Sequence, residues 1–397
     1  MIRGAHGNLV LEVLLDGLRR WRYGPGFPKT RRAVLSAVLS LAVVPALEAS
    51  PLVYRVLDLG MLPGDLDSYA YGLNNSGDVV GQSANVETHT HQAFLYRNGE
   101  LQDLSASLGD GESVAYGIND RGQVAGAMNG LRDGFLYSDG VVTPIPRPSG
   151  AFSTEARDVN DAGDATGTIS FGTSTSAFLF HDGALDAIGT LPGDDISHAR
   201  AINNVGQIVG TSIRQQPNLV RPFLYEDGEM RPLSGSFGSA FDINESGQVA
   251  GTYSGHAFLY SNGVLRDLGA LPGDTFSAAF ALNNRGDVIG SSGSRFFLVR
   301  DYAMMVLANL IWDAPGWQLD DVWDINDRGQ IVGTAAFAPD GSHALRYHAV
   351  LLSPMDDVQP VPEPDTFFLF AVGLTILSMP TIYRLLRMRW PGIRAAG

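Results

Sequence analysis

Residues 240–269 read AFDINESGQVAGTYSGHAFLYSNGVLRDLG, and this stretch decides the fold. Asn244 and Gly247 suit the two ends of a type I turn, because Gly adopts a left-handed backbone without a Cβ clash. Asn262-Gly263 is a strong short hairpin signal. Between these turns, short apolar runs predict four strands, at 240–244, 248–253, 256–260 and 264–268. One such sheet cannot bury both of its faces, so it needs neighbours.

The same first hairpin occurs seven times, at intervals of 39 to 45 residues. Its copies begin at Ala70, Ala115, Ala156, Ala199, Ala240, Ala279 and Val322. The second hairpin, HAFLYSNGVLRDL from His256, recurs in five units and is altered in the last two. Units of this length with about four strands are typical of propeller blades. The sequence therefore predicts an all-β fold, a seven-bladed β-propeller of four-stranded repeats over residues 50–354.

The two ends of the repeat region complement each other. Residues 54–60, YRVLDLG, resemble the fourth strand of a unit that lacks its first three strands. The seventh unit has a third strand at 348–353 and no fourth, and the sixth has a degenerate fourth strand within 302–311. Closing a ring with a strand from the other terminus removes exposed sheet edges. We therefore expect residues 54–59 to pair antiparallel with 348–353.

The first strand of each unit has its own pattern. Its third position is small or Asp, and small residues suit a strand that is crowded near the axis of a ring. Asp158, Asp242 and Asp324 occupy this position in alternate units. If the position borders the axis, the three carboxylates could converge on a cation. The favoured interpretation is that each one accepts hydrogen bonds from local backbone amides, because buried carboxylates need partners.

The composition excludes several kinds of chemistry. The chain has no Cys, which rules out disulfides, thiol catalysis and Cys-based zinc sites. Residues 50–365 carry 16 basic and 39 acidic residues, in a chain of net charge −15. Such a surface repels phosphate backbones, so we expect no nucleic-acid partner. Solubility alone would explain the acidic surface, although cations or cationic partners would also be attracted to it.

The motifs predict no catalytic residue, no cofactor and no metal site. Gly-x-Ser-x-Gly, His-Glu-x-x-His and phosphate-binding loops do not occur. The Asn turns lack the alternating oxygens and the bidentate acid of a calcium loop, so we interpret them as hairpin turns. His89 and His91 have no evident third metal ligand, which favours a solvated loop. The aromatic residues of the FLY strands could form a sugar platform, but core packing is the favoured interpretation.

Residues 1–49 predict an export signal with an N-terminal extension. The basic residues KTRR at 29–32 precede an apolar core at 33–47 and then small residues, which is the pattern of a secretory signal peptide. Cleavage after Ala49 fits this pattern. A buried helix is the alternative, and the arginine pair fits a twin-arginine export route as well as the general secretory route.

The composition changes after Pro354. Residues 355–365 are acidic and Pro-rich, which predicts an extended linker. Residues 366–383 form an uncharged run of 18 residues, about 27 Å long as a helix and just enough to span a bilayer. Arginines follow at once, so residues 366–397 predict a transmembrane sorting helix whose Arg-rich tail stays in the cytoplasm.

Two family resemblances follow. Residues 54–354 resemble the HAF-repeat family of bacterial extracellular proteins, whose motif stands here as His256-Ala257-Phe258. The C-terminus resembles a PEP-CTERM sorting signal through Pro362, Glu363, Pro364, the apolar span, and Arg384, Arg387 and Arg389. This resemblance implies an exosortase-type processing enzyme as a partner, in bacteria that make extracellular polysaccharide. The protein would be anchored transiently in the inner membrane, then cut and placed on the cell surface or outside the cell. A permanent single-span membrane protein that is not cut is the alternative.

Three functions fit these observations. The favoured one is a non-enzymatic surface or matrix protein whose propeller binds a polysaccharide or another surface protein. The alternatives are a glycan lyase or hydrolase with carboxylates at the propeller mouth, and a purely structural matrix component. No carboxylate pair in the sequence has a spacing that marks catalysis, so we expect a protein that is not an enzyme.

Overall fold

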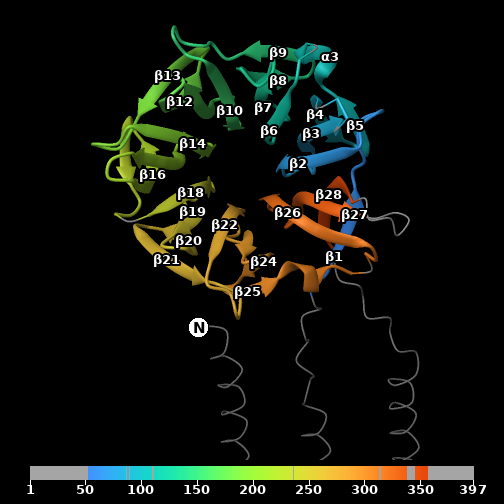
Figure 1. Ribbon diagram of the computed structural model, residues 1–397. Helices are drawn as coiled ribbons and strands as arrows, with labels where there is room; N and C mark the ends of the chain where they lie inside the picture. The colour runs from blue at the N-terminus through green and yellow to red at the C-terminus, as the bar shows by residue number, and fades with distance from the viewer. Residues whose placement is uncertain are drawn as a thin grey trace, which may run out of the picture. The chain divides into compact units, whose positions relative to one another are not determined.

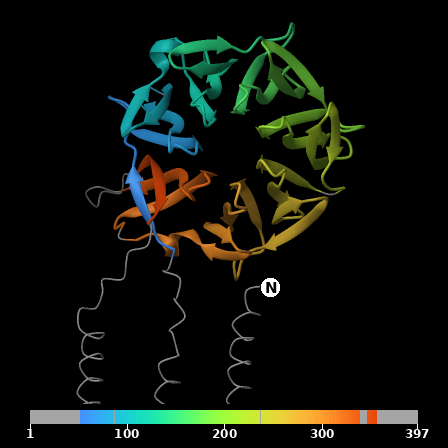
Figure 2. The same ribbon diagram turned by 180° about the vertical axis from the view of Figure 1, so that it is seen from behind.

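The computed structural model describes residues 52–355, apart from 86, 89, 110, 236, 313 and 338–344. This part of the chain forms seven four-stranded antiparallel sheets. Figures 1 and 2 show the sheets as blades around a central axis, with the first strand of each blade innermost. The prediction of a seven-bladed β-propeller is confirmed.

The first four blades each use four consecutive strands. Blade 1 contains β2 (Asp67–Leu73), β3 (Val79–Asn85), β4 (Thr90–Arg97) and β5 (Glu100–Asp103). Blade 2 contains β6 (Val114–Ile118), β7 (Val124–Met128), β8 (Asp133–Ser138) and β9 (Val141–Pro144). Blade 3 contains β10 (Ser153–Val159), β11 (Ala165–Ser170), β12 (Thr175–His181) and β13 (Ala184–Gly189). Blade 4 contains β14 (Ile196–Ile202), β15 (Ile208–Arg214), β16 (Leu219–Glu226) and β17 (Glu229–Pro232).

The remaining blades follow the same order until the last one. Blade 5 contains β18 (Gly238–Ile243), β19 (Val249–Tyr253), β20 (His256–Ser261) and β21 (Val264–Gly269). Blade 6 contains β22 (Ser277–Leu282), β23 (Val288–Ser292), β24 (Arg295–Arg300) and β25 (Ala303–Val306). Blade 7 contains β26 (Trp317–Ile325), β27 (Ile331–Phe337), β28 (Arg346–Pro354) and β1 (Tyr54–Asp58). The short helices α3 (Ser105–Leu108) and η2 (Leu307–Leu310) connect blades.

Blade 7 closes the ring with strands from both ends of the described chain. β1 pairs antiparallel with β28, and Tyr54 lies opposite Pro354. The imidazole of His348 reaches across this pair to Asp58 (Nδ1–Oδ2 3.0 Å), and Tyr54 is fully buried. The predicted pairing of 54–59 with 348–353 is therefore confirmed, as is the weak fourth strand of blade 6, which is β25.

Both predicted hairpin turns have the expected backbone. In blade 5 the amide of Gly247 donates to the carbonyl oxygen of Asn244 (3.0 Å), and Gly247 has a φ of +70°. Asn262 and Gly263 have φ values of +50° and +82°. Two consecutive positive φ values are what a type I′ turn requires, so the Asn-Gly signal is confirmed.

Phenylalanines on the third strands form the core between blades. Phe258 is fully buried, as are its equivalents Phe94, Phe135, Phe178, Phe223 and Phe297. A Cβ added to Gly251 would lie 2.7 Å from the Phe258 ring and 2.1 Å from the Ser239 carbonyl oxygen. This crowding explains the Gly that closes each first-hairpin repeat. For the phenylalanines, core packing is confirmed over a sugar platform.

Several predictions fall outside the described residues. They are the export signal with its cleavage at Ala49, the sorting motif Pro362, Glu363 and Pro364, the apolar span, and the arginines Arg384, Arg387 and Arg389. Within residues 52–355, no helix is both long and apolar enough to cross a bilayer.

Candidate functional site

The central channel has two ends with different residues. Each first strand points toward the central opening and then enters the Asn turn that leads to the second strand (Figure 1). One end is therefore surrounded by seven turns, and we call it the turn end, defined by Asn74 and its six equivalents. A second group of residues lies three positions earlier in each first strand, on the side of the channel away from the turns. We call this side the entry end, defined by Tyr71 and its six equivalents.

At the turn end, one buried Asn per blade uses both polar atoms of its side chain. Asn244 Oδ1 accepts hydrogen bonds from the amides of Ser246 and Gln248, each at 3.0 Å. Its Nδ2 donates to Gln248 Oε1 (2.8 Å) and to the backbone carbonyl of Asn283 in blade 6 (3.1 Å). The side chain thus closes its own turn and joins two blades.

The bond from one Asn to the next passes around the whole ring. Asn326 of blade 7 donates to the carbonyl of Asn74 in blade 1 (3.0 Å), which completes the circle. Its members are Asn74, Asn119, Asn160, Asn203, Asn244, Asn283 and Asn326. The interpretation as hairpin turns is confirmed. The hydrogen bonds between blades were not predicted from the sequence. The presence of the same Asn in all seven repeats was a signal for them.

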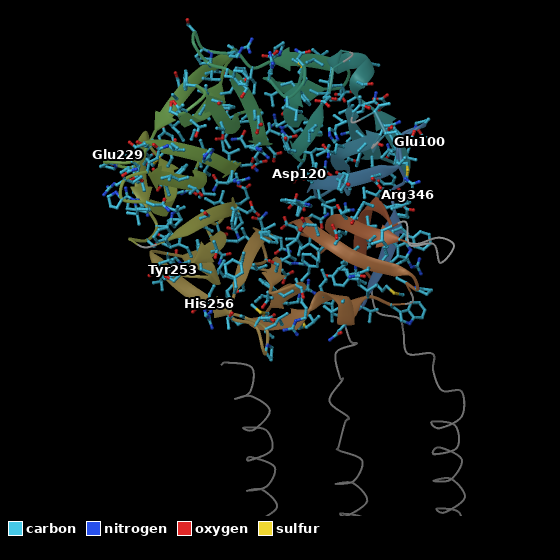
Figure 3. All side chains as sticks on the ribbon, viewed as in Figure 1. Glu100, Asp120, Glu229, Tyr253, His256 and Arg346 are labelled. Carbon is cyan, nitrogen blue, oxygen red and sulfur yellow. The ribbon has the colours of Figure 1, made fainter. Side chains whose placement is uncertain are left out.

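A second ring lies one residue further along each turn. The amide of Asn75 donates to Asp120 Oδ1 (2.7 Å), and the amide of Asp327 returns to Asn75 Oδ1 (2.8 Å). Figure 3 shows Asp120 at the edge of the central opening. The members of this ring are Asn75, Asp120, Asp161, Asn204, Glu245, Asn284 and Asp327. Four carboxylates therefore surround the turn end.

Asp158, Asp242 and Asp324 join blades slightly deeper in the channel. Asp242 accepts a hydrogen bond from its neighbour Ile243 (2.8 Å) and another from Leu282 of blade 6 (2.8 Å). Asp158 and Asp324 make the same pair of bonds, to Val159 and Ile202 and to Ile325 and Leu73. The expected local bond is confirmed for one oxygen of each carboxyl. The other oxygen binds the next blade, which the sequence had not indicated.

Burial dominates the titration of these three carboxyl groups. It raises the pKa of Asp158 to about 7, that of Asp242 to about 6 and that of Asp324 to about 8. Repulsion from Asp242 raises the pKa of the other two further. Among the described residues, no group of three or more His, Asp or Glu side chains is placed to hold a metal ion.

A cavity of about 160 Å³ remains at the turn end. Its lining consists of the two turn rings together with Asp242, Asp324 and aliphatic residues, and it includes no basic or aromatic side chain of the described chain. The polar groups of the rings are engaged in holding one blade to the next. We therefore assign the turn end to the stability of the ring.

The entry end is built on a β-bulge in every first strand. In blade 1 the pairing with β3 shifts between Ala70 and Gly72, which leaves Tyr71 as the extra residue. The same shift occurs in all seven blades. Bulges re-aim a side chain and are common next to binding sites. The bulged residues are Tyr71, Tyr116, Arg157, Arg200, Phe241, Phe280 and Trp323.

Several of these side chains contact their neighbours in the adjacent blade. The ring of Tyr71 lies 5.9 Å from that of Tyr116 and 5.6 Å from that of Trp323. The guanidinium of Arg157 lies 4.2 Å from the centre of the Tyr116 ring. Phe241 and Phe280 form another edge-on pair at 6.1 Å. Five aromatic residues and two arginines thus occupy the seven bulge positions, and we call this set the belt; its Trp323 is 42 % exposed.

A polar pocket of about 380 Å³ opens beside this belt, between blades 3 and 4. β10 contributes Glu155 and Arg157, and β14 contributes His198 and Arg200. Hydroxyl groups complete the lining, from Ser153, Thr168, Ser170 and Thr175. Thr175 Oγ1 lies 3.3 Å from His198 Nε2. The pocket therefore combines charged groups with hydroxyls that can both donate and accept hydrogen bonds.

The two arginines of the pocket differ in their partners. Arg157 Nη2 lies 2.6 Å from Glu155 Oε2, whereas no acid of the described residues lies within ion-pair distance of Arg200. Partial desolvation and the charge of Arg157 lower the pKa of Arg200, although its side chain remains exposed to solvent. Burial and both guanidinium groups lower the pKa of His198 below its usual range, so the imidazole is neutral at pH 7. The pocket thus has a net positive charge.

Sequence reasoning did not identify the entry end. It noted the small first and third positions of the first strand but passed over the second, where the bulge lies. The signal was a position held by aromatic residues or Arg in all seven units, between neighbours that are small. A bulge cannot be predicted from the sequence of a single hairpin. The residues at this position therefore looked like part of the regular alternation of side chains between the two faces of a strand.

The histidine pair is placed only in part. His91 lies in β4 and not in a loop, because the pairing with β3 continues to Asn85 and Thr90. The expectation of a solvated loop is therefore wrong for His91, whose Nδ1 is buried and has no hydrogen-bond partner in the described chain. His89 lies outside the described residues, so its role as a ligand stays untested.

Comparison with known proteins finds distant structural neighbours and no match by sequence. No family model matches the sequence, and no curated protein matches it. The chain is similar to a gluconolactonase from Xanthomonas campestris (12 % identity, 78 % of this chain and 96 % of that one, TM-score 0.42). It is also similar to the β-propeller domain of the Trilobed protease from Pyrococcus furiosus (9 % identity, 75 % of this chain and 99 % of that one, TM-score 0.44). A third similar structure is TolB from Acinetobacter baumannii (13 % identity, 73 % of this chain and 80 % of that one, TM-score 0.38).

Proposed function

We propose that this protein is a non-enzymatic propeller of the cell surface or extracellular matrix that binds a polysaccharide at the entry end of its channel. The observation that carries this proposal is the belt of five aromatic residues and two arginines at the bulges. Aromatic side chains offer large, rigid apolar faces, and tyrosine and tryptophan add a polar edge. Such faces can stack on sugar rings, while the neighbouring hydroxyls bond to sugar hydroxyls.

A glycan array probed with the purified full chain tests this function. We expect binding to one class of oligosaccharide, and we expect Trp323→Ala to weaken it about tenfold or more, because buried aromatic contacts dominate many interfaces. Asp120→Asn, at the turn end, is the matched control and should bind like the wild type. If Trp323→Ala and Asp120→Asn bind equally well, the ligand does not use the entry end.

A glycan-active enzyme is the alternative, and one observation favours a lyase over a hydrolase. Hydrolysis by two carboxyl groups needs a pair, and Glu155 is the single carboxylate among the described residues that line the pocket. His198, by contrast, is neutral beside two arginines, which suits a base next to a bound anion. Release of unsaturated or reducing ends from the bound oligosaccharide would overturn the non-enzymatic proposal. If neither binding nor release is observed, a structural matrix role is favoured.

The cellular address is part of the same proposal. The chain is exported, its signal is removed after Ala49, and residues 366–383 hold it briefly in the inner membrane. An exosortase-type enzyme then cuts near Pro362-Glu363-Pro364 and releases the propeller to the cell surface or medium. Mass spectrometry of protein from cells and medium tests both cuts. A mature chain that keeps Arg384, Arg387 and Arg389 would contradict the second cut, and one that keeps residues 33–47 would contradict the first.

A further inference from the structure

The pocket between blades 3 and 4 contains a positive charge that has no ion-pair partner among the described residues. Arg157 is neutralised by Glu155, but Arg200 has neither an ion pair nor a hydrogen bond with any described residue. The groups that face it are Arg157 and Glu155 from β10 and His198 from its own strand. The Arg200 side chain is exposed at the edge of the pocket, so its guanidinium is open to a ligand, and the neighbouring charge of Arg157 adds to its positive potential.

Other arginines, such as Arg55 and Arg328, also lack an ion pair with a described residue, but Arg200 in addition lines a pocket. Residues 50–365 carry 39 acidic and 16 basic residues, so partners for a lone arginine are plentiful. Elsewhere, the buried Asp194 is paired with Arg214 and Arg221, and Asp274 with Arg295. An unpaired guanidinium beside a pocket, with hydroxyls around it, is the arrangement expected when a ligand supplies the anion.

We propose that this pocket binds the carboxylate of a uronic-acid unit in the polysaccharide, with Arg200 as the group that recognises it. The inference rests on the proposed function, because it assumes a polysaccharide at the entry end. The pocket volume of about 380 Å³ falls in the range of small-ligand sites. A planar carboxylate matches the two-pronged face of a guanidinium. The hydroxyl of Thr175 and the imidazole of His198 are then available to the sugar hydroxyls.

The overall charge argues for isolated anionic groups in the ligand. A dense polyanion such as a nucleic acid would be repelled by the acidic surface of the propeller. A glycan with one carboxylate per few sugars places single charges in the pocket, while neutral sugars between them can lie along the aromatic belt. The ring of Tyr116 is already held by the guanidinium of Arg157, so this side of the belt is fixed in place.

Calorimetry with a matched pair of oligosaccharides tests the inference. The first ligand contains uronic acid, and the second is the same oligosaccharide with its carboxyl groups reduced to alcohols. We expect the full chain to bind the acidic form about tenfold to a hundredfold more tightly, which is the range for a hydrogen-bonded charge pair. Arg200→Gln should remove this preference and leave binding of the neutral form unchanged. Arg200→Lys should restore only part of it, because an ammonium lacks the fork geometry.

Controls separate this inference from the proposed function. Arg266→Gln removes an arginine that stacks on Tyr302, at 3.9 Å and away from the pocket, and should keep the preference. If the acidic and neutral forms bind equally, the inference is wrong and the proposed function stands. If neither form nor any other glycan binds, both are wrong. A sulfated oligosaccharide that binds as tightly as the uronate would also overturn the choice of a carboxylate. Equal thermal unfolding of wild type and Arg200→Gln would show that a lost preference is not a loss of folding.

Discussion

The two ends of the channel are built on the same seven strands, yet their residues vary in opposite ways. At the turn end, the fifth position of the repeat is Asn in every blade. At the entry end, the second position is Tyr, Tyr, Arg, Arg, Phe, Phe and Trp in blade order. The two positions are three residues apart, or about 10 Å along a strand.

The difference follows from the hydrogen bonds of each position. Asn244 joins its own turn to the next blade, so a change there leaves several buried groups without partners. A bulged residue is the extra residue of the pairing, so its side chain can vary without breaking the sheet. A position that is uniform across a ring holds the ring together. A position that varies from blade to blade makes one part of the ring chemically different from another, which recognition of a specific ligand requires.

The largest effect is expected from Asn244→Ala, which tests whether the turn end is structural. The variant loses four side-chain hydrogen bonds, two to amides and two from the amide group. We expect a loss of about 3–4 kcal/mol in the free energy of unfolding, since each bond contributes about 1 kcal/mol and buried partners are left unpaired. Denaturant unfolding measures it.

The exposed Ser246 of the same turn provides the control for that variant. Ser246→Ala keeps the backbone amide that Asn244 accepts from, and its loss should stay within about 0.5 kcal/mol. If the two variants unfold at the same denaturant concentration, the Asn ring does not carry the stability that its geometry indicates.

Much of this comparison could be predicted from the sequence. The repeat gave the blade count, the Asn-Gly turns, the closing strand at Tyr54 and the core position of Phe258. What escaped prediction were contacts that exist only once the ring is closed. The bond from Asn326 to Asn74 joins residues far apart in the chain, and the belt depends on a bulge that no single repeat reveals. Local sequence patterns determine the four strands of a blade. The contacts of the residues near the axis depend on the neighbouring blades, so local patterns do not predict them.

A smaller effect is expected from pH, through the carboxyl groups that join blades. Burial raises the pKa of Asp324 to about 8, well above its value near 3.8 in an unfolded chain. Between these values the folded protein binds more protons than the unfolded one, so stability falls as pH rises from about 4 to about 8. Asp324→Asn should make this slope shallower. Unfolding of both proteins at several pH values measures it.

Comparison with the variant isolates Asp324 from other groups that titrate in this range. His181 has a raised pKa through its bond to Asp164, so it also contributes stability that is lost as pH rises. Asp58 and Asp287 have lowered pKa values, and their contribution is lost only when pH falls below about 4. Parallel pH curves for wild type and Asp324→Asn would mean that this carboxyl is ionised in the folded protein.

The smallest effect is expected from Asp120→Asn, in the outer ring of the turn end. Asp120 is exposed, and its Oδ1 accepts the amide of Asn75 (2.7 Å), which an amide oxygen can also do; the bond from Asn75 Nδ2 to Asp120 Oδ2 (2.9 Å) is lost but is exposed, so water can replace it. Asn already holds this place in three of the seven blades, at Asn75, Asn204 and Asn284. We therefore expect a change within about 0.5 kcal/mol in the free energy of unfolding.

The opposite substitution at the neighbouring residue, Asn119→Asp, provides the comparison for Asp120→Asn. Asn119→Asp replaces a buried Nδ2 donor, which bonds Gln123 Oε1 (2.8 Å) and the Asn160 carbonyl (2.7 Å), with an oxygen that faces both acceptors. It should cost about 2–4 kcal/mol. The two variants exchange the same two residue types at adjacent positions, so composition cannot explain a difference. Equal unfolding midpoints would mean that the inner ring is no more structural than the outer one, and the contrast between the two ends of the channel would lose its basis.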